Sequence, residues 1–177
     1  MAPYLFNSQI DDWHSWSRVF QSIDLFKGII DCIHSRHGLD CDDIRLMTPG
    51  TNANFWVNNR VLKIYPPKEI GVTGNSCEAI EDEIQALVRA EELKILAPRV
   101  LAQGLIRDRY DFSYMILSYI EGREAYKVVP KMSPSEKCSF ASTIREICQA
   151  LHSDFPRDYD EAALRRRAIE NHRWKIF

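Results

Sequence analysis

The sequence predicts an α+β fold, in which an antiparallel sheet of about five strands carries one packed helix. Short segments rich in β-branched and aromatic residues follow one another between turn residues. We expect strands at 44–47, 54–58, 60–65, 98–106 and 112–120. A helical period interrupts them over 77–94. Consecutive strands with one inserted helix are typical of a hairpin-linked sheet that this helix covers.

Turn residues support these boundaries. Pro49-Gly50 marks a turn after the first strand, and Asn58-Asn59 predicts a tight hairpin between the second and third. Pro66-Pro67 ends the third strand, because proline donates no hydrogen bond to a sheet.

Helices are predicted on both sides of the sheet segment. Residues 11–37 have helical spacing and stop at Gly38, and Trp13 and Trp16 are expected in the core. Ser133-Pro134 predicts a helix start, and a last helix is expected over 159–173. The predicted organisation is therefore an N-terminal helical segment, a central lobe, and a linker with C-terminal helices, at 1–43, 44–122 and 123–177.

Composition restricts the classes of partner. The 177-residue chain is 45% hydrophobic and has a formal net charge of −2. This balance gives no general attraction to nucleic acid or to an anionic membrane. The five cysteines are scattered without a CxxC motif, and the N-terminus lacks the pattern of a secretory signal. We expect a reduced, cytoplasmic protein, with no nucleic acid or membrane as partner.

Three features suggest a binding site. Lys63 lies in a strand that otherwise looks buried, on the face shared by Val61 and Tyr65. A lysine on a half-buried face needs a counter-charge, and Glu83 of the predicted helix can supply it. The polar loop Gly50–Asn54 precedes both and has amides that can bind phosphate. Each feature also has a plain alternative: an edge-strand lysine, a solvated acidic helix face, or a loop that binds nothing.

The order of these pieces resembles the N-terminal lobe of the aminoglycoside phosphotransferase and choline kinase family, which are protein-kinase-like small-molecule kinases. The resemblance covers residues 44–152. It rests on the stretches GTNANFWV, RVLKIY, EIQAL, PRVLAQG, YMILSYIEG and CQALH.

The resemblance implies a role for each matching residue. Lys63 would contact the α- and β-phosphates of ATP or GTP, and Glu83 would orient it. The loop, with Gly50, Thr51, Asn52 and Asn54, would cover the phosphates. The base would be read by the carbonyl of Ser118 and the amide of Ile120, and lined by Ile64 and Met115.

The family's catalytic loop, H-G-D-x-x-x-x-N, and its later magnesium-binding aspartate have no counterpart that we recognise in the sequence. His152-Ser153-Asp154 imitates the first letters, but Tyr159 stands where the asparagine belongs. This chain by itself is therefore not expected to catalyse phosphoryl transfer or to supply the Mg²⁺ ligands. Either it is part of a longer kinase, or it is a non-catalytic module that acts by association, with a homodimer through its C-terminal helices as one form.

The sequence supports nucleic-acid binding and metal binding less well. Arg165–Arg167 with Trp174 could contact nucleic acid, but no reading motif accompanies them. His34 and His37 lack a completing set of metal ligands and are expected at the surface. The acceptor remains open among aminoglycosides, choline-like molecules and sugars.

Overall fold

The structure is a computed structural model that describes residues 4–67 and 76–153. The chain divides into two compact units, Met1–Glu124 and Ala125–Phe177. The first contains the whole sheet and the N-terminal helices, so the segment 1–43 does not form a unit of its own. Each unit is described by itself below.

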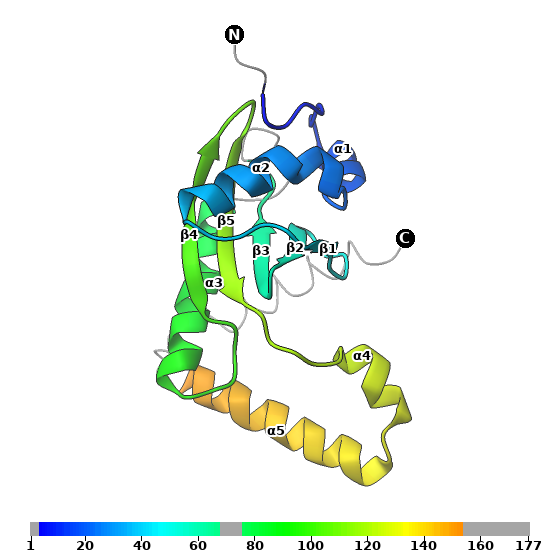
Figure 1. The fold of residues 1–177 in the computed structure, drawn as a ribbon. Helices are drawn as coiled ribbons and strands as arrows, with labels where there is room; N and C mark the ends of the chain where they lie inside the picture. Colours follow the sequence, from blue (N-terminus) through cyan, green and yellow to red (C-terminus); the bar gives the residue numbers. More distant parts are fainter. Residues whose placement is uncertain (1–3, 68–75, 154–177) are drawn as a thin grey trace. The chain divides into compact units, whose positions relative to one another are not determined.

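The sheet has five antiparallel strands in the order β1-β2-β3-β5-β4 (Figure 1). Their bounds are Ile44–Leu46 (β1), Ala53–Val57 (β2), Arg60–Ile64 (β3), Val100–Arg107 (β4) and Asp111–Ser118 (β5). Helix α3, Ser76–Glu92, lies in the chain between β3 and β4. The predicted α+β architecture is confirmed. β5 ends earlier than expected, so Tyr119 and Ile120 lie beyond the strand.

The β2–β3 hairpin forms as the sequence predicts. Asn58 and Asn59 have φ values of 44° and 63°, which is the left-handed conformation that both central residues of a type I′ turn require. The turn pairs Val57 with Arg60, and the register then runs to Ala53 opposite Ile64. This register fixes which residues of the loop lie beside the lysine strand.

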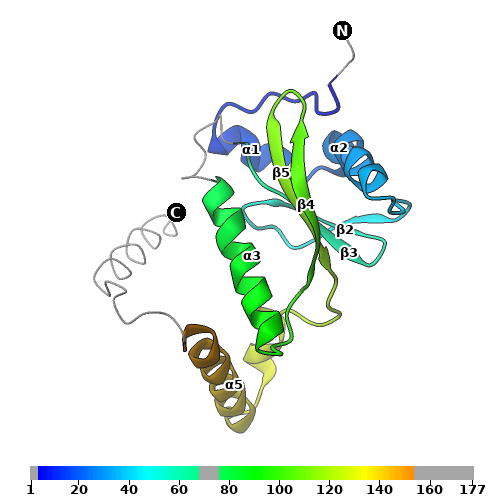
Figure 2. The same cartoon turned by 90° about the vertical axis from the view of Figure 1, so that its left-hand side faces the viewer.

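Helices cover opposite faces of the sheet. Figure 2 shows α2, Ile23–Arg36, on one side of β4 and β5 and α3 on the other. The larger core lies on the side of α1, Trp13–Val19, and α2. Its fully buried large side chains include Phe6, Trp16, Phe26, Phe55 and Phe112. Alternation along the strands therefore places one set of residues under the N-terminal helices and the other set under α3.

The extended N-terminal segment is tied to the β4–β5 turn. The carboxylate of Asp108 accepts hydrogen bonds from the amides of Leu5 and Phe6, both at 2.9 Å. The hydroxyl of Tyr110 accepts another from the Ile10 amide at 2.9 Å. Because these contacts join residues 100 to 103 positions apart, the segment from Leu5 to Ile10 is an integral part of the first unit.

Two expectations for the N-terminal helices are wrong in detail. The helical stretch breaks after Val19 and restarts at Ile23, because Ser22 caps a new helix by accepting from the Leu25 amide. Trp13 is 40% exposed, whereas Trp16 is fully buried. The apolar spacing identified the helical region, but not the tryptophan that faces the core.

His34 is also misassigned by the sequence, since it is completely buried rather than at the surface. Its Nδ1 lies 2.9 Å from the carbonyl oxygen of Ile30. Its Nε2 is buried without a hydrogen-bond partner among the described residues. Burial, as the main cause, lowers the pKa of His34 because the charged form loses its hydration.

We expect this buried histidine to make the first unit less stable in mild acid. The unfolded chain takes up a proton near pH 6.5, about the unperturbed value, while folded His34 resists protonation. Its contribution is therefore complete above about pH 6.5 and is lost as the pH falls through the lowered pKa. The urea midpoint of the wild type should therefore be lower below this pH than above it. In His34→Phe the two midpoints should differ less. The exposed His14→Phe variant should keep the wild-type dependence.

The second unit is helical where it is described. It contains α4, Ala125–Val128, a 3-10 turn, Val129–Lys131, and α5, Pro134–His152. As predicted, Ser133 caps α5: its hydroxyl accepts from the Glu136 amide, and the Glu136 carboxylate accepts from the Ser133 amide at 2.7 Å. The predicted helix 159–173 and Arg165–Arg167 lie outside the described residues.

Candidate functional site

Lys63 lies in a row of side chains that crosses the sheet. In the register, it stands opposite Asn54 of β2 on one side and opposite Met115 of β5 on the other. Gln103 of β4 stands opposite Met115. Directly opposed residues share a face of an antiparallel sheet. This row therefore continues from Asn54, at the end of the loop of residues 50–54, to β4.

The face that carries Lys63 is the one covered by α3. Tyr65, Met115 and Leu117 form a buried cluster there with Ile80 of α3. The helix has this position because Ile80, Ile84 and Leu87 recur at helical spacing and pack toward the sheet. Glu83, next to Ile84, is thereby brought over the lysine strand.

The predicted ion pair between Lys63 and Glu83 is present. The Lys63 Nζ lies 2.7 Å from Oε1 and 2.5 Å from Oε2 of Glu83. The two side chains are 18% and 31% exposed. The pair is therefore only partly screened by water, which makes it stronger than one on an open surface.

Tyr65 completes this arrangement. Its hydroxyl donates to Glu83 Oε2 at 2.8 Å, and its ring lies 5.2 Å from the Lys63 ammonium. Burial first, and then the hydrogen bond to Glu83, raise the pKa of Tyr65 well above its ordinary value. The phenol thus remains a donor at neutral pH and helps to fix the carboxylate that holds the lysine.

The loop of residues 50–54 lies beside this pair. Asn54 is directly opposite Lys63, and a Cβ placed on Gly50 would lie 3.6 Å from the Asn54 Nδ2. Gly50 has no positive φ, in contrast to Gly38 at the end of α2. The fold itself therefore does not require a glycine at position 50. Thr51 is exposed and Asn52 is half-buried.

A second row on the same face was missed by the sequence reasoning. The register pairs Arg45 with Trp56, Trp56 with Val61, and Val61 with Leu117. The Arg45 guanidinium lies 4.5 Å from the Trp56 ring centroid. Tyr119, just beyond β5, meets the Trp56 ring edge to face with a centroid distance of 6.2 Å. Strand alternation two residues from Lys63 was the signal that could have identified this surface.

Ile64 is separated from the other candidates. It is fully buried in the core beneath the N-terminal helices, on the face opposite Lys63. This is a necessary result of alternation, because neighbours in a strand point to opposite faces. Met115 is on the correct face and is fully buried in the cluster beneath α3. Ile64 is therefore dropped from the candidate site.

The end of β5 supplies the remaining candidates. The Ser118 hydroxyl accepts from the Arg99 amide at 2.8 Å, and the Ser118 amide donates to the Arg99 carbonyl at 2.9 Å. Ile120 is 37% exposed two residues further on. Ser118 is thus fixed to Arg99, the residue before β4, and the chain reaches the surface at Ile120.

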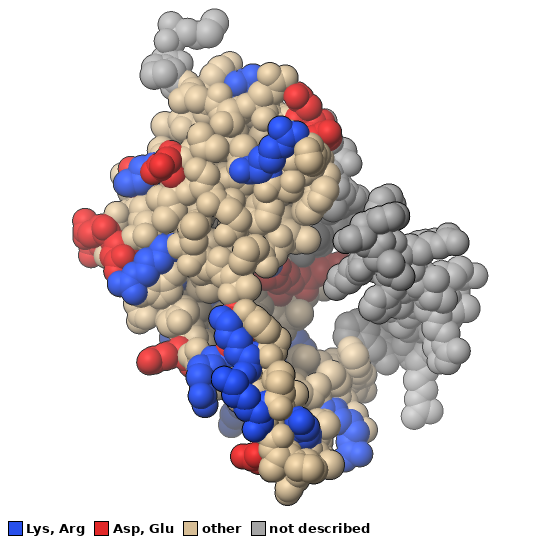
Figure 3. Space-filling view, turned by 90° about the vertical axis from the view of Figure 1, so that its right-hand side faces the viewer, with Lys and Arg blue, Asp and Glu red and all other residues tan. Residues whose placement is uncertain are grey.

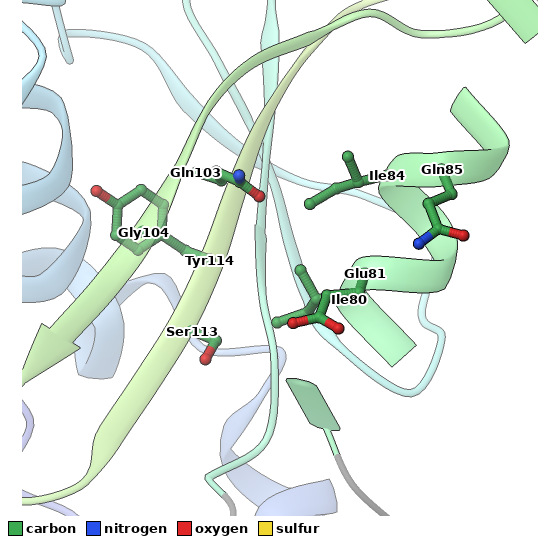
Figure 4. Close-up of a pocket in the computed structure, with 8 residues that line it drawn as sticks. All are labelled: Ile80, Glu81, Ile84, Gln85, Gln103, Gly104, Ser113 and Tyr114. Carbon is green, nitrogen blue, oxygen red and sulfur yellow. The ribbon is translucent and has the colours of Figure 1, made fainter. Parts of the chain in front are cut away.

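A hollow of about 530 Å³ lies between α3 and the strands β4 and β5 (Figure 4). Ile80 and Ile84 of α3 face Gln103 and Ser113 of the strands across it. Tyr114 points away from α3, toward the other face of the sheet. The helix that carries Glu83 is therefore incompletely packed against β4 and β5.

Charged patches, metal sites and membrane-spanning helices would indicate other functions for the described residues. Figure 3 shows Lys, Arg, Asp and Glu in small separate groups on the upper part of the face it displays. Among the described residues, no three His, Cys, Asp or Glu side chains are grouped so that they could hold a metal ion. In that same part of the chain, no helix has the length and apolar character needed to cross a membrane.

A protein-family model matches most of the chain. The model of the APH family, described as the phosphotransferase enzyme family, matches residues 45–176. The chain has no significant match among curated proteins or solved structures. The matched range includes Lys63, Glu83 and the loop between β1 and β2, and it covers most of the sequence. The chain therefore belongs to the APH phosphotransferase enzyme family.

Proposed function

We propose that this chain is the nucleotide-binding part of an ATP- or GTP-dependent small-molecule phosphotransferase. The observation that carries the proposal is the ion pair between Lys63 and Glu83, half-buried beside the loop of residues 50–54. In kinase-like phosphotransferases a strand lysine paired with a helix glutamate contacts the nucleotide phosphates. The family match supports the assignment of the same roles here.

The chemistry of the pair suits a polyanion. An ammonium has three N–H donors, and the two short contacts of Lys63 both go to Glu83. One donor therefore remains for the α- and β-phosphates. Tyr65 and Glu83 hold the ammonium in place before any ligand arrives. The side chains of the site therefore lose less conformational entropy when a ligand binds.

The remaining contacts are assigned by position. The loop would cover the phosphates with backbone of Gly50, Thr51 and Asn52 and with the side chain of Asn54. The fold does not require a glycine at position 50. Because glycine has no side chain, a ligand can approach the backbone there closely. The Ser118 carbonyl and the Ile120 amide would read the base, with Trp56, Val61, Leu117 and Met115 on the sheet face that carries Lys63. Mg²⁺ would arrive bound to the triphosphate.

The proposal is tested with Mg-ATP and Mg-GTP. A ligand at 100 times its Kd stabilises the folded state by about 2.7 kcal/mol, so a clear rise in Tm is expected for the wild type. Lys63→Met should weaken binding at least tenfold, which at the same ligand concentration leaves about 1.4 kcal/mol or less and removes about half of the rise or more. The control is Lys27→Met, since Lys27 lies on α2 and pairs with Asp31. It should behave like the wild type.

Two outcomes would contradict the proposal. One is a wild-type Tm that neither Mg-nucleotide changes. The other is an equal rise in the wild type and in Lys63→Met, because binding would then not involve the ion pair. Isothermal titration on the same three proteins gives the affinities directly.

A second candidate is a non-catalytic module that acts by association. No described residue of α5 is buried, and Phe140 and Ile144 of its apolar face are 36% and 45% exposed. A second copy of the chain could cover this face as a homodimer. Light scattering over a concentration series separates the candidates, since association through α5 requires a mass above the monomer that Ile144→Ser reduces.

A further inference from the structure

A single hydrogen bond connects the N-terminal helices to the loop of the candidate site. The indole Nε1 of Trp16 donates to the backbone carbonyl of Thr51 at 2.9 Å, between residues 35 positions apart. Trp16 is fully buried, while Thr51 lies in the exposed loop before β2. The family match begins at residue 45, so this anchor comes from outside the matched range.

The donor side of this bond is rigid. The Trp16 ring stacks on Phe20 with a centroid distance of 6.1 Å and meets Phe26 edge to face at 5.9 Å. The helix that carries it begins with a complete capping box between Asp12 and Ser15. Core packing and the cap together fix the direction in which the indole N–H points.

The acceptor side determines the direction of the next amide. A trans peptide is planar, so the carbonyl of Thr51 and the N–H of Asn52 point in opposite directions. The carbonyl points to Trp16, on the side of α1 and α2. The Asn52 amide therefore points away from these helices, which cover the sheet face opposite Lys63. No described group accepts a hydrogen bond from this amide.

We propose that Trp16 is a positioning residue for the nucleotide site, because it turns the Thr51–Asn52 peptide so that the Asn52 amide donates to a phosphate. This inference rests on the proposed function. It assigns the N-terminal helical segment a task in binding, in addition to covering the sheet. The indole itself touches no ligand and acts only through the peptide that it holds.

The test compares a nucleotide with its nucleoside. Trp16→Phe keeps an aromatic ring in the core, but it removes the N–H donor together with one ring of the buried indole. Trp13→Phe is the matched control, since Trp13 lies on the same helix and is 40% exposed. Dissociation constants are measured by calorimetry for Mg-ATP and adenosine, and for Mg-GTP and guanosine.

We expect Trp16→Phe to weaken triphosphate binding by about fivefold to tenfold. This is less than the loss of a whole hydrogen bond to a charged group, because the Asn52 amide is still present and is only held less well. The nucleoside affinity should be unchanged, because it has no phosphate for the Asn52 amide. Trp13→Phe should leave both affinities at the wild-type level. The ratio of the two constants is the decisive quantity, since a general loss of structure would lower both affinities together.

An unchanged ratio in Trp16→Phe would overturn the inference while the proposed function stands. A wild type that binds no Mg-nucleotide would overturn the proposed function and the inference with it. If Trp16→Phe does not fold, the ¹H–¹⁵N signal of Asn52 in the wild type decides. A shift on adding the Mg-nucleotide but not its nucleoside supports the inference, and the same response to both, or none, refutes it.

Discussion

Replacing Phe26 by alanine is expected to lower the free energy of unfolding of the first unit by about 3–5 kcal/mol, the range for removing a buried aromatic side chain. Phe26 is fully buried. Its ring contacts those of Phe6, Trp16, Phe55 and Phe112, with centroid distances of 4.9, 5.9, 5.7 and 5.9 Å. The cavity would therefore open where the N-terminal helices meet the sheet.

Urea denaturation followed by hydrogen exchange measures this effect. Because the N-terminal helices share one core with the strands, amides of β2 and β3 should lose protection together with those of α2. Phe140→Ala, which truncates a 36% exposed ring on α5, should change stability by about 0.5 kcal/mol or less. Faster exchange confined to α2, with β2 and β3 unaffected, would show that the helices are not part of the lobe's core.

The second large effect is expected at the ion pair. Glu83→Leu leaves the Lys63 ammonium, only 18% exposed, without its counter-charge and removes the acceptor of the Tyr65 hydroxyl. Open surface pairs contribute about 0.2–1 kcal/mol, and breaking a fully buried pair costs about 3–5 kcal/mol. For this half-buried pair we expect a loss of about 2 kcal/mol, between these two ranges.

A double-mutant cycle isolates the interaction. Lys63→Met combined with Glu83→Leu should be less destabilised than the sum of the single variants, because neither charge is then left without its partner. The control cycle uses Lys27 and Asp31, an i,i+4 pair on α2 in which both side chains are 49% exposed. Its coupling should be about 0.3–0.5 kcal/mol. Equal coupling in the two cycles would refute a special role for the Lys63–Glu83 geometry.

Local signals were sufficient for the elements of the candidate site. The Asn58-Asn59 turn sets the β2–β3 register, and this register places Asn54 beside Lys63. The helical period of α3 places Glu83 next to its packed side. These are interactions between neighbours in sequence, or across a two-residue turn, so one sequence is enough to predict them. The same alternation also excludes Ile64 from the lysine face, which the resemblance alone did not show.

The sequence by itself determined the α+β class and the hairpin, because hydrophobic period and turn chemistry are properties of short segments. It offered Glu83 as a counter-charge for Lys63, but these residues are 20 positions apart, and the packing of α3 on the sheet decided that they pair. Only the tertiary structure decided that Trp16 and His34 are buried, that Trp13 is not, and that the Trp16 indole reaches the carbonyl of Thr51. A periodic pattern shows which residues share a face. What covers that face depends on segments distant in the chain, whose contacts leave no local trace in the sequence.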